Sequence, residues 1–487
     1  MELRASLLQV VEQVIGQLDG TCLVIENETV DRLRSLFDLS TFEAALVVLC
    51  AGYAMTPAVS SRIGGMLTFG YAFEHLPEAH LDAAAPTRPL RRHGILNLAS
   101  GFGTIEAPLS IDERVLSFML GVETLDERIL PHTTQVYESS GPLTPSQSEF
   151  VRVLASAVSQ GQSLQVFGGD ARGRGVLITA IAKISGRLPL WIRASSLLLS
   201  LEVFDLLQRL VEREVLLSGV LPVVDLDVDD SAEVSRSARL FANNLSVPIV
   251  VCAAEVLKLN KAATSFAVPE SSAAERYALW DQVLPGRDRD AGALAYQFRL
   301  TPSQIQDIVS SARIAPSFAN IWARCREAAR LQLDDLAHRI EPRADWDTLV
   351  LAPSATAALH ELVNQSNLRY EVHETWGLAR GDRGKAITAL FHGPSGTGKT
   401  HAAEVIARAV ELDLIHVDLS QIVDKYVGET EKRIRRLFDT AERGGAVLLF
   451  DEADAIFGKR GNIERGTDRW ANNEDRNISD FGVGCEG

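Results

Sequence analysis

The chain has 487 residues, 46% of them hydrophobic, which is too long for one ordinary core and predicts about three globular domains. Its 64 acidic and 48 basic residues give a net charge of −16, which would repel nucleic acid and anionic membranes as primary partners. The five cysteines are far apart and form no C-x-x-C pair, a pattern that suggests neither a disulfide framework nor a thiolate zinc site and indicates reduced thiols in a cytoplasm.

The first 18 residues predict an amphipathic helix rather than a signal peptide. Leu7, Val11 and Val14 fall on one helical face, and Glu2 and Glu12 break the basic-then-apolar order of an export signal. The longest apolar run, "AALVVLCAGYAM" at 44–55, is shorter than the ~20 residues that a bilayer requires. We therefore expect a buried core helix there and no membrane span.

Two capping-box patterns predict helix starts in this region. "STFE" runs from Ser40 to Glu43 and "SIDE" from Ser110 to Glu113, each just before an apolar-periodic stretch. The segment "SSGPLTPSQ" at 139–147 is rich in Ser, Pro and Gly, which is typical of a linker. Residues 1–138 are thus predicted to form a mainly helical N-terminal domain.

Beyond this linker, short apolar runs alternate with helical patterns, as in a parallel sheet covered by helices. Five strands are predicted, in the segments "SLQVFGG", "LPLWIRAS", "LPVVDLDV", "VPIVVCAA" and "TSFAVPE". The stretch at 271–330 is helical without further strands and is predicted to be a lid. We expect an α/β domain with a helical lid at 148–338.

After a second predicted linker at 339–347, the strand, loop and helix order begins again. Three strands are predicted in "ITALFHG", "LDLIHVDLS" and "AVLLFDEAD", within a domain at 345–487. Two glycine-rich loops, which start at Gly168 and Gly393, lie 225 positions apart in the two domains. This repetition indicates an internal duplication.

The second loop, "GPSGTGKT", follows an apolar strand pattern and opens an amphipathic helix, the context in which such a motif is a phosphate-binding site. The glycines would let backbone N–H groups surround phosphate oxygens at a helix N-terminus. Lys399 would neutralise the β- and γ-phosphates of ATP, and the Thr400 hydroxyl would bind Mg²⁺. The predicted nucleotide-binding residues are Gly393, Pro394, Ser395, Gly396, Thr397, Gly398, Lys399, Thr400 and His401.

Two carboxylates end the apolar run "VLLFDEAD". Asp451 would hold hydrated Mg²⁺, and Glu452 would orient and polarise the attacking water. Adjacent acidic residues at a strand end are often only a solvated turn. Downstream of an intact phosphate loop, the catalytic interpretation is favoured.

The first loop, "GGDARGRG", departs from the same motif. Arg174 stands in the place of the lysine and Gly175 in the place of the hydroxyl residue, while Leu226 replaces the second carboxylate after Asp225. The guanidinium of arginine is wide and forked where a compact ammonium is needed. The first α/β domain is therefore predicted to fold without catalysing hydrolysis and to serve as a scaffold.

Between the two intact motifs lies "DKYVGETEKRIRRLFDTAE", which resembles the AAA family of ATPases. In that family an aromatic residue of the first pore loop grips polypeptide in a ring's central channel, and the resemblance assigns this role to Tyr426 and Val427. The alternative is a surface tyrosine before a charged helix. The resemblance is most specific over 385–474, less specific over 140–340, and contributes little over 1–135.

The resemblance implies tandem P-loop NTPase sheets of strand order 5-1-4-3-2, the first module degenerate and the second with sound Walker A and B motifs. The arrangement is similar to bacterial AAA proteins, some of which are encoded with contractile, phage-tail-like injection systems. It implies ATP and Mg²⁺ as cofactors, a protein substrate or complex as partner, and a homo-oligomeric ring in a cytoplasm.

The family pattern is lost after "DRWANNE", and the tail resembles the product of a frameshift or premature stop. The fourth and fifth strands, the arginine finger and the lid of the second module would then be missing, so impaired hydrolysis is expected. Two hypotheses follow: an ATPase that remodels protein complexes, or a non-hydrolysing nucleotide-binding scaffold or assembly factor. A metalloenzyme is disfavoured because no histidine forms H-E-x-x-H.

Overall fold

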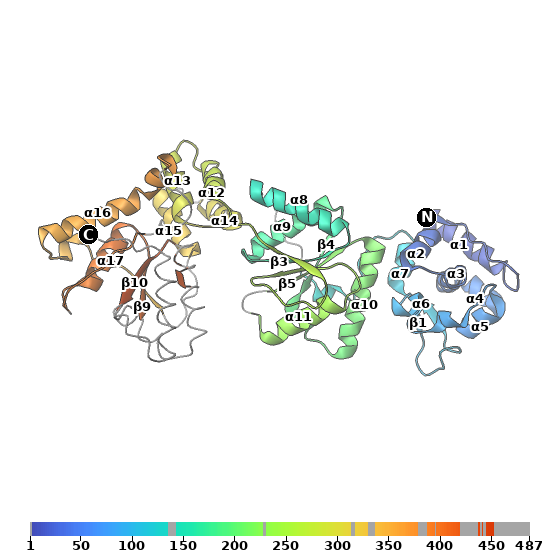
Figure 1. Cartoon of the computed structure of the whole chain (residues 1–487). Coiled ribbons are helices and arrows are strands. Elements are labelled where there is room, and N and C mark those ends of the chain that lie inside the picture. Colours follow the sequence, from blue (N-terminus) through green and yellow to red (C-terminus); the bar gives the residue numbers. More distant parts are fainter. Residues whose placement is uncertain are drawn as a thin grey trace. The chain divides into compact units, whose positions relative to one another are not determined.

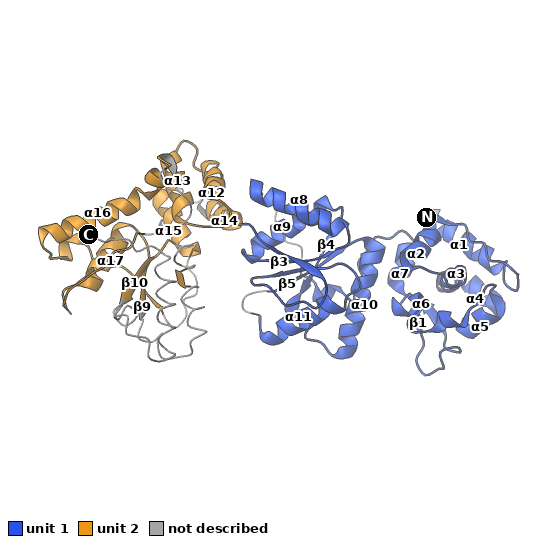
Figure 2. Ribbon diagram, viewed as in Figure 1, with its two compact units in different colours: residues 1–269 blue, residues 270–487 orange. Residues whose placement is uncertain are grey.

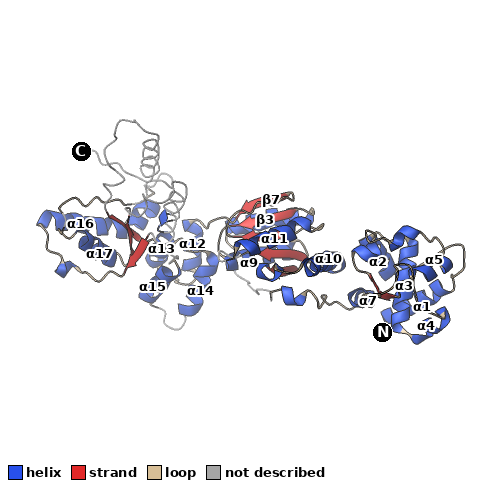
Figure 3. Ribbon diagram, turned by 90° about the horizontal axis from the view of Figure 1, so that it is seen from below, coloured by secondary structure: helices blue, strands red, loops and turns tan. Residues whose placement is uncertain are grey.

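The computed structural model describes residues 2–134, 143–226, 230–312, 317–329, 337–377, 387–394, 396–418, 437–438, 441 and 445–451. The chain divides into two compact units, residues 1–269 and 270–487 (Figures 1 and 2). The fold is mixed α/β, with a helical N-terminal region and a five-stranded parallel sheet (Figure 3). The three domain boundaries expected from the sequence stay a prediction.

The N-terminal part of the first unit is mainly helical. Its elements are α1 (Glu2–Ile15), α2 (Glu28–Phe37), α3 (Thr41–Met55), α4 (Pro57–Ile63), α5 (Phe69–His75), η1 (Leu81–Ala84), α6 (Pro89–Arg92), β1 (Leu96–Leu98), β2 (Leu109–Ile111), α7 (Glu113–Met119) and η2 (Leu130–His132). The predicted apolar face of α1 is buried at Leu7, Val11 and Val14.

Helix α3 forms the centre of this region. Ser40 and Glu43 make the expected capping box, in which the Ser40 hydroxyl accepts from the Glu43 N–H and the Glu43 carboxylate accepts from the Ser40 N–H. Its residues from Phe42 to Gly52 are buried, so the predicted core helix is confirmed. In the part of the chain that the structure describes, no helix is long and apolar enough to cross a membrane.

The second predicted capping box is wrong. Ser110 lies in strand β2, where it pairs with Asn97 of the antiparallel strand β1, and the N-cap of α7 is Asp112. The Asp112 carboxylate accepts a hydrogen bond from the Arg114 N–H at 3.0 Å. Both Ser110 and Asp112 are residue types that cap helices, so the sequence pattern alone did not distinguish them. Because Ser110 pairs within a strand, Asp112 is the residue that caps α7.

The rest of the first unit is the five-stranded sheet with its helices. Its elements are α8 (Pro145–Ser159), β3 (Ser163–Phe167), α9 (Ala171–Ile184), β4 (Pro189–Arg193), η3 (Ala194–Leu197), α10 (Leu201–Ser218), β5 (Leu221–Asp225), α11 (Ala232–Asn244), β6 (Val250–Ala253) and β7 (Ala263–Ala267). The strands run parallel in the order β4-β5-β6-β3-β7. Numbered along the chain, this is 2-3-4-1-5, the reverse reading of 5-1-4-3-2, and all five predicted strands are confirmed.

Helices cover both faces of this sheet (Figure 1). On one face α8 and α9 pack on Leu164, Val166 and Val223, and on the other α10 and α11 pack on Ile192 and Val251. Side chains along each strand alternate between these two cores, as a strand's geometry requires. Burial on both faces explains why the strands read as continuous apolar runs.

A buried charge cluster joins the N-terminal helical part to helix α10. The Arg213 side chain is fully buried and contacts Asp126 at 2.5 Å and Asp112 at 3.0 Å, and Arg114 pairs with the buried Glu214 at 2.7 Å. Leu217, at the end of α10, lies in the N-terminal hydrophobic core. Helix α10 therefore contributes side chains both to the core of the N-terminal helical part and to one core of the five-stranded sheet.

The second unit contains helices and a three-stranded sheet. Its elements are α12 (Ala273–Asp281), α13 (Asp288–Gln297), α14 (Pro302–Ala312), α15 (Phe318–Ala328), β8 (Ala337–Ile340), η4 (Trp346–Thr348), α16 (Pro353–Asn367), η5 (Glu371–Thr375), α17 (Lys399–Ala409), β9 (Leu414–Asp418) and β10 (Val447–Asp451). The sheet has the order β10-β9-β8, with β9 and β10 parallel and β8 antiparallel to β9.

Two expectations for this sheet need correction. Strand β8 overlaps the first two residues of the predicted linker 339–347, and the "ITALFHG" segment is not a strand over residues 387–392. The Leu390 side chain is 86% exposed. An apolar run forms a strand only where a neighbour pairs with its backbone, and β9 is the described neighbour of β10.

Candidate nucleotide-binding site

The second glycine-rich loop ends at the start of helix α17. Gly396 and Gly398 have φ angles of 82° and 85°, in the left-handed region that glycine adopts without strain. Gly398 is the N-cap of α17 and provides no side-chain hydrogen bond to its first N–H groups. A helix start without a side-chain cap is suited to an anion such as phosphate.

Lys399 lies over the loop that precedes it. Its ammonium donates to the carbonyl oxygens of Gly393 at 2.9 Å and Pro394 at 3.0 Å, and the Thr397 hydroxyl donates to the same Pro394 oxygen at 2.8 Å. The loop is thus held by its own lysine and threonine. The flexible Lys399 side chain donates both of its hydrogen bonds to backbone carbonyl oxygens. Phosphate oxygens can therefore replace these carbonyls as acceptors for the ammonium.

Helix α17 packs on the strand pair β9–β10. Ala403 and Ala407 contact Leu414, Val447 and Leu449 in one apolar cluster. Small residues let the helix approach the sheet closely.

The two strands and the helix bring three candidate groups to one edge. The turn at 410–413 joins the end of α17 to the start of β9, so α17 begins near the opposite, carboxyl end of β9. Asp451, the last residue of β10, pairs in register with Asp418, the last residue of β9. The order of the elements thus directs the start of α17, with Lys399 and Thr400, and the end of β10, with Asp451, toward the carboxyl edge of the sheet, where ligands bind in parallel α/β folds.

His401 links the loop helix to an upstream segment. Its Nε2 lies 2.9 Å from the Thr348 hydroxyl of η4. Arg408, further along α17, reaches the carboxylate of Asp345 at 3.8 Å. The segment 345–348 is thereby held along α17, beside the predicted nucleotide-binding residues.

Several predicted site residues lie outside the described part of the chain. These are Ser395, the pore-loop residues Tyr426 and Val427, and the catalytic candidate Glu452. For Asp451 the structure gives the strand position only. Their roles stay predictions.

The first glycine-rich loop is closed by its own side chains. Asp170 is the N-cap of α9, and its carboxylate accepts a hydrogen bond from the Gly173 N–H at 2.7 Å. The Asp170 carboxylate thus accepts a hydrogen bond from an N–H group at the start of α9, a place where phosphate would bind in an intact loop. Within the described part of the second loop, the equivalent helix start carries no side-chain cap.

Arg174 completes this closure. Its side chain is 2% exposed and pairs with Asp225 at 3.1 Å, at the end of β5. It also donates to the carbonyl oxygens of Gly168, Gly169 and Leu226. A buried arginine with several acceptors leaves this position only if all of these bonds break together, unlike Lys399.

Sequence reasoning missed the role of Asp170. The signal was present, since an aspartate directly before a helix is a strong N-cap residue. The differences from the intact loop at the lysine and hydroxyl positions do not involve this residue.

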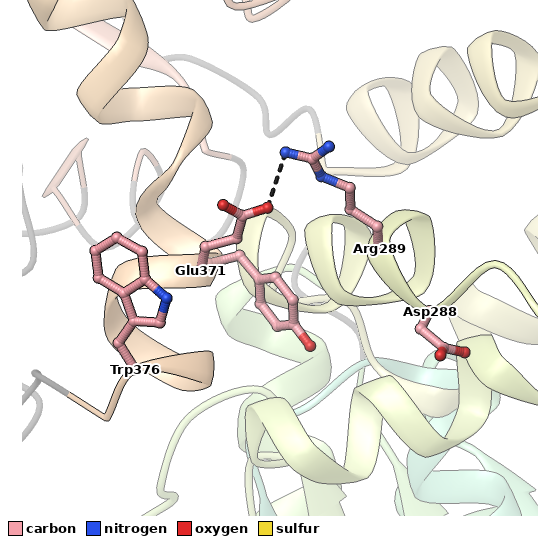
Figure 4. A pocket seen from close by; sticks show the side chains of 5 residues that line it. Asp288, Arg289, Glu371 and Trp376 are labelled. Carbon is pink, nitrogen blue, oxygen red and sulfur yellow. Dashed lines mark ion pairs between the residues drawn. The ribbon is translucent and has the colours of Figure 1, made fainter.

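A separate pocket of about 320 Å³ lies elsewhere in the second unit (Figure 4). It is lined by Asp288 and Arg289 of α13 and by Tyr370, Glu371 and Trp376. Arg289 pairs with Glu371 at 2.8 Å, and the Arg289 side chain is largely exposed. Among the described residues, none of the phosphate loop lines this pocket, which is therefore treated as separate from the candidate site.

Two family models match parts of the chain. Residues 389–477 match the model "ATPase family associated with various cellular activities (AAA)". Residues 272–331 match the model "Contractile injection system ATPase helical domain". The first segment contains the intact loop and β10, and the second spans α12 to α15.

Curated relatives match the chain over about a quarter of its length. An uncharacterized AAA family ATPase of Sinorhizobium fredii is 34% identical over 122 residues, which cover 25% of this chain and 35% of the relative. The peroxisomal ATPase PEX6 of Arthrobotrys oligospora is 34% identical over 122 residues, 25% of this chain and 10% of the relative. The 26S proteasome regulatory subunit 7 homolog of Saccharomyces cerevisiae is 34% identical over 137 residues, 26% of this chain and 28% of the relative.

The aligned region thus covers about a third or less of these relatives. Residues 389–477 match the AAA ATPase family, and residues 272–331 match the helical domain of contractile injection system ATPases.

Proposed function

We propose that this chain is an AAA ATPase that binds ATP with Mg²⁺ at residues 393–401 and couples its hydrolysis to the remodelling of protein complexes. The observation that carries the proposal is the loop at 396–398, whose glycines precede a helix without a side-chain cap and whose lysine lies over the loop. The match of 389–477 to the AAA family supports it.

The residues have distinct roles in this proposal. The N–H groups at the start of α17 and the Lys399 ammonium would bind the phosphates, while Thr400 and Asp451 would hold Mg²⁺. The metal ion would neutralise charge that develops on the phosphate oxygens. Glu452 would orient the attacking water and accept its proton. His401 and Thr348 would lie beside the bound nucleotide.

The partners are proposed on the same basis. The match of 272–331 to a contractile injection system ATPase supports a protein complex of such a system as the substrate. Tyr426 and Val427 would grip polypeptide within a homo-oligomeric ring in the cytoplasm. The first module, closed by Asp170 and Arg174, would be a scaffold that needs no nucleotide.

One observation favours the second candidate, a nucleotide-binding scaffold with little turnover. The segment that leads into the loop, 387–392, is not a strand and exposes Leu390. Because strand pairing does not anchor the segment before the loop, the phosphate-binding groups of the loop are positioned less accurately relative to Asp451. Errors of ~1 Å in such positions can cost about 10²-fold in rate.

A phosphate-release assay separates the two candidates. If the chain is a working ATPase, the purified protein releases phosphate from ATP and Glu452→Gln lowers the rate by at least about 10²-fold, because the water is no longer activated. A Glu361→Gln variant is the matched control, since Glu361 is an exposed residue of α16 outside the candidate site. A rate that Glu452→Gln leaves unchanged would favour the scaffold.

A further inference from the structure

The helices α12 to α15 share a hydrophobic core with the phosphate-loop helix. Leu294 and Phe298 from the first part of this helical segment, and Ile321 from α15, lie in one buried cluster with Val410 and Leu412. The last two residues follow directly on α17. The sequence predicts this helical segment as a lid of the first module. In the structure it packs against the residues that follow α17, the helix that begins at the second glycine-rich loop.

Helix α15 binds the turn that joins α17 to β9. The Trp322 indole N–H donates to the carbonyl oxygen of Glu411 at 3.0 Å. Arg326, one helical turn further on, lies 3.6 Å from the carboxylate of Asp413, whose side chain is only 14% exposed. Glu411 has a φ angle of 56°, so this turn has a defined left-handed conformation that Trp322 holds.

Helix α13 binds a second turn, which precedes β10. The Gln297 side-chain amide donates to the carbonyl oxygen of Gly445 at 3.2 Å. Gly445 has a φ angle of 61°, and a side chain there would collide with Gln297. The end of α13 and Trp322 of α15 are joined through Phe298, whose ring lies edge-on to the Trp322 ring with a centroid distance of 4.9 Å.

The two turns lie at the far ends of the elements that carry the candidate site. Helix α17 runs from Lys399 to the turn at Glu411, and β10 runs from the turn at Gly445 to Asp451. A rigid helix or strand that is displaced at one end moves its other end, so a shift at either turn changes the position of Lys399 relative to Asp451.

We propose that the helical segment 273–328 is coupled to the nucleotide at 393–400 through these two turns, with Trp322 as the main positioning residue. The inference rests on the proposed nucleotide site, although it does not require hydrolysis. Because coupling between two sites is reciprocal, nucleotide binding must in turn alter the helical segment.

The test is hydrogen exchange of the full chain with and without a non-hydrolysable ATP analogue, together with the affinity for a fluorescent ATP analogue. In the wild type, the analogue is expected to change the exchange of 318–328 and 410–413. Trp322→Ala is expected to remove this response and to weaken nucleotide binding about 5-fold or more, the lower range of measured couplings. Trp322→Phe keeps the ring on Phe298 but lacks the N–H donor, and is expected to fall in between.

Trp280→Phe is the matched control. Trp280 is fully buried in the same hydrophobic cluster, but its indole nitrogen makes no hydrogen bond within the described residues. If Trp280→Phe removes the nucleotide response as fully as Trp322→Phe does, the effect is loss of packing and the inference is wrong. If Trp322→Ala does not fold, the comparison of the nucleotide response between Trp322→Phe and Trp280→Phe tests the inference.

Lys399→Ala separates this inference from the proposed function. If Lys399→Ala binds the analogue as tightly as the wild type, the nucleotide site itself is misassigned. If Lys399→Ala abolishes binding while the Trp322 variants keep the wild-type affinity and exchange response, the site stands and the coupling is refuted.

Discussion

Arg174 and Lys399 occupy equivalent positions in the two loops, and both side chains donate to carbonyl oxygens of their own loop. The difference lies in what else they contact. Arg174 is buried and also pairs with Asp225, whereas the described contacts of Lys399 are with loop carbonyls. One cation is therefore part of the folded core, while the other is available to a ligand.

This difference predicts that Arg174 contributes to stability. Arg174→Met is expected to destabilise the first unit by about 1–3 kcal/mol, because Asp225 and the loop carbonyls lose a charged donor. Urea unfolding, followed by hydrogen exchange in β3 and β5, measures this. Lys183→Met in the same helix removes an exposed cation and is expected to change stability by less than about 0.5 kcal/mol. Equal effects of the two variants would contradict the structural role of Arg174.

The buried cluster around Asp126 predicts a dependence of stability on pH. Burial alone raises the pKa of Asp126, but the hydrogen bonds and charge of Arg128, with the charge of Arg213, outweigh burial and hold the pKa below its ordinary value. A lowered pKa in the folded state stabilises the protein above the ordinary value of about 3.9, and this contribution is lost as the pH falls through the folded-state value.

Asp126→Asn is therefore expected to lower the unfolding free energy of the first unit at neutral pH and to flatten its loss below about pH 4. Urea unfolding at several pH values checks both effects. Asp205→Asn, an exposed position on α10, is the control and is expected to follow the wild-type curve. A wild-type curve that is already flat below pH 4 would show that Asp126 carries no such contribution.

At the scale of elements, the two serine patterns at the N-terminus give a matched pair. Ser40 caps α3 and Ser110 lies in β2, although both are followed by a glutamate at the same spacing. Ser40→Ala is expected to cost about 1 kcal/mol, the usual value of a lost N-cap, and Ser110→Ala less than about 0.5 kcal/mol. Thermal unfolding compares them, and a larger loss for Ser110→Ala would contradict this assignment.

Helices and strands that are set by burial and local sequence pattern could be predicted from the sequence. Strands and contacts that require a segment distant in sequence could not. The strands of the first sheet are buried on both faces, so their apolar runs identified all five. The run at 387–392 is equally apolar, yet its described residues form no strand. The cap that Asp170 provides to Gly173 is local, so the sequence carried its signal. The hydrogen bond of Trp322 to Glu411 joins segments 89 positions apart, and no local pattern encodes it.

At the scale of the whole molecule, the contacts of α12 to α15 place them in the second compact unit. Limited proteolysis is therefore expected to divide the chain near residue 269 and to leave 273–328 with the fragment that contains α17. Mass spectrometry of the early fragments measures this. Recovery of a stable fragment that ends near 338 and separates from the rest would instead support the boundary at 338.

The central claim is that nucleotide binds at the second loop and not at the first. Binding of a fluorescent ATP analogue to the full chain, titrated in the presence of Mg²⁺, tests it most directly. We expect Lys399→Ala to abolish binding, whereas Arg174→Ala, if it remains folded, binds with the wild-type affinity, because the first loop has neither the lysine nor the hydroxyl residue and Asp170 caps its helix. Loss of binding in folded Arg174→Ala with binding retained in Lys399→Ala would assign the nucleotide to the first loop instead.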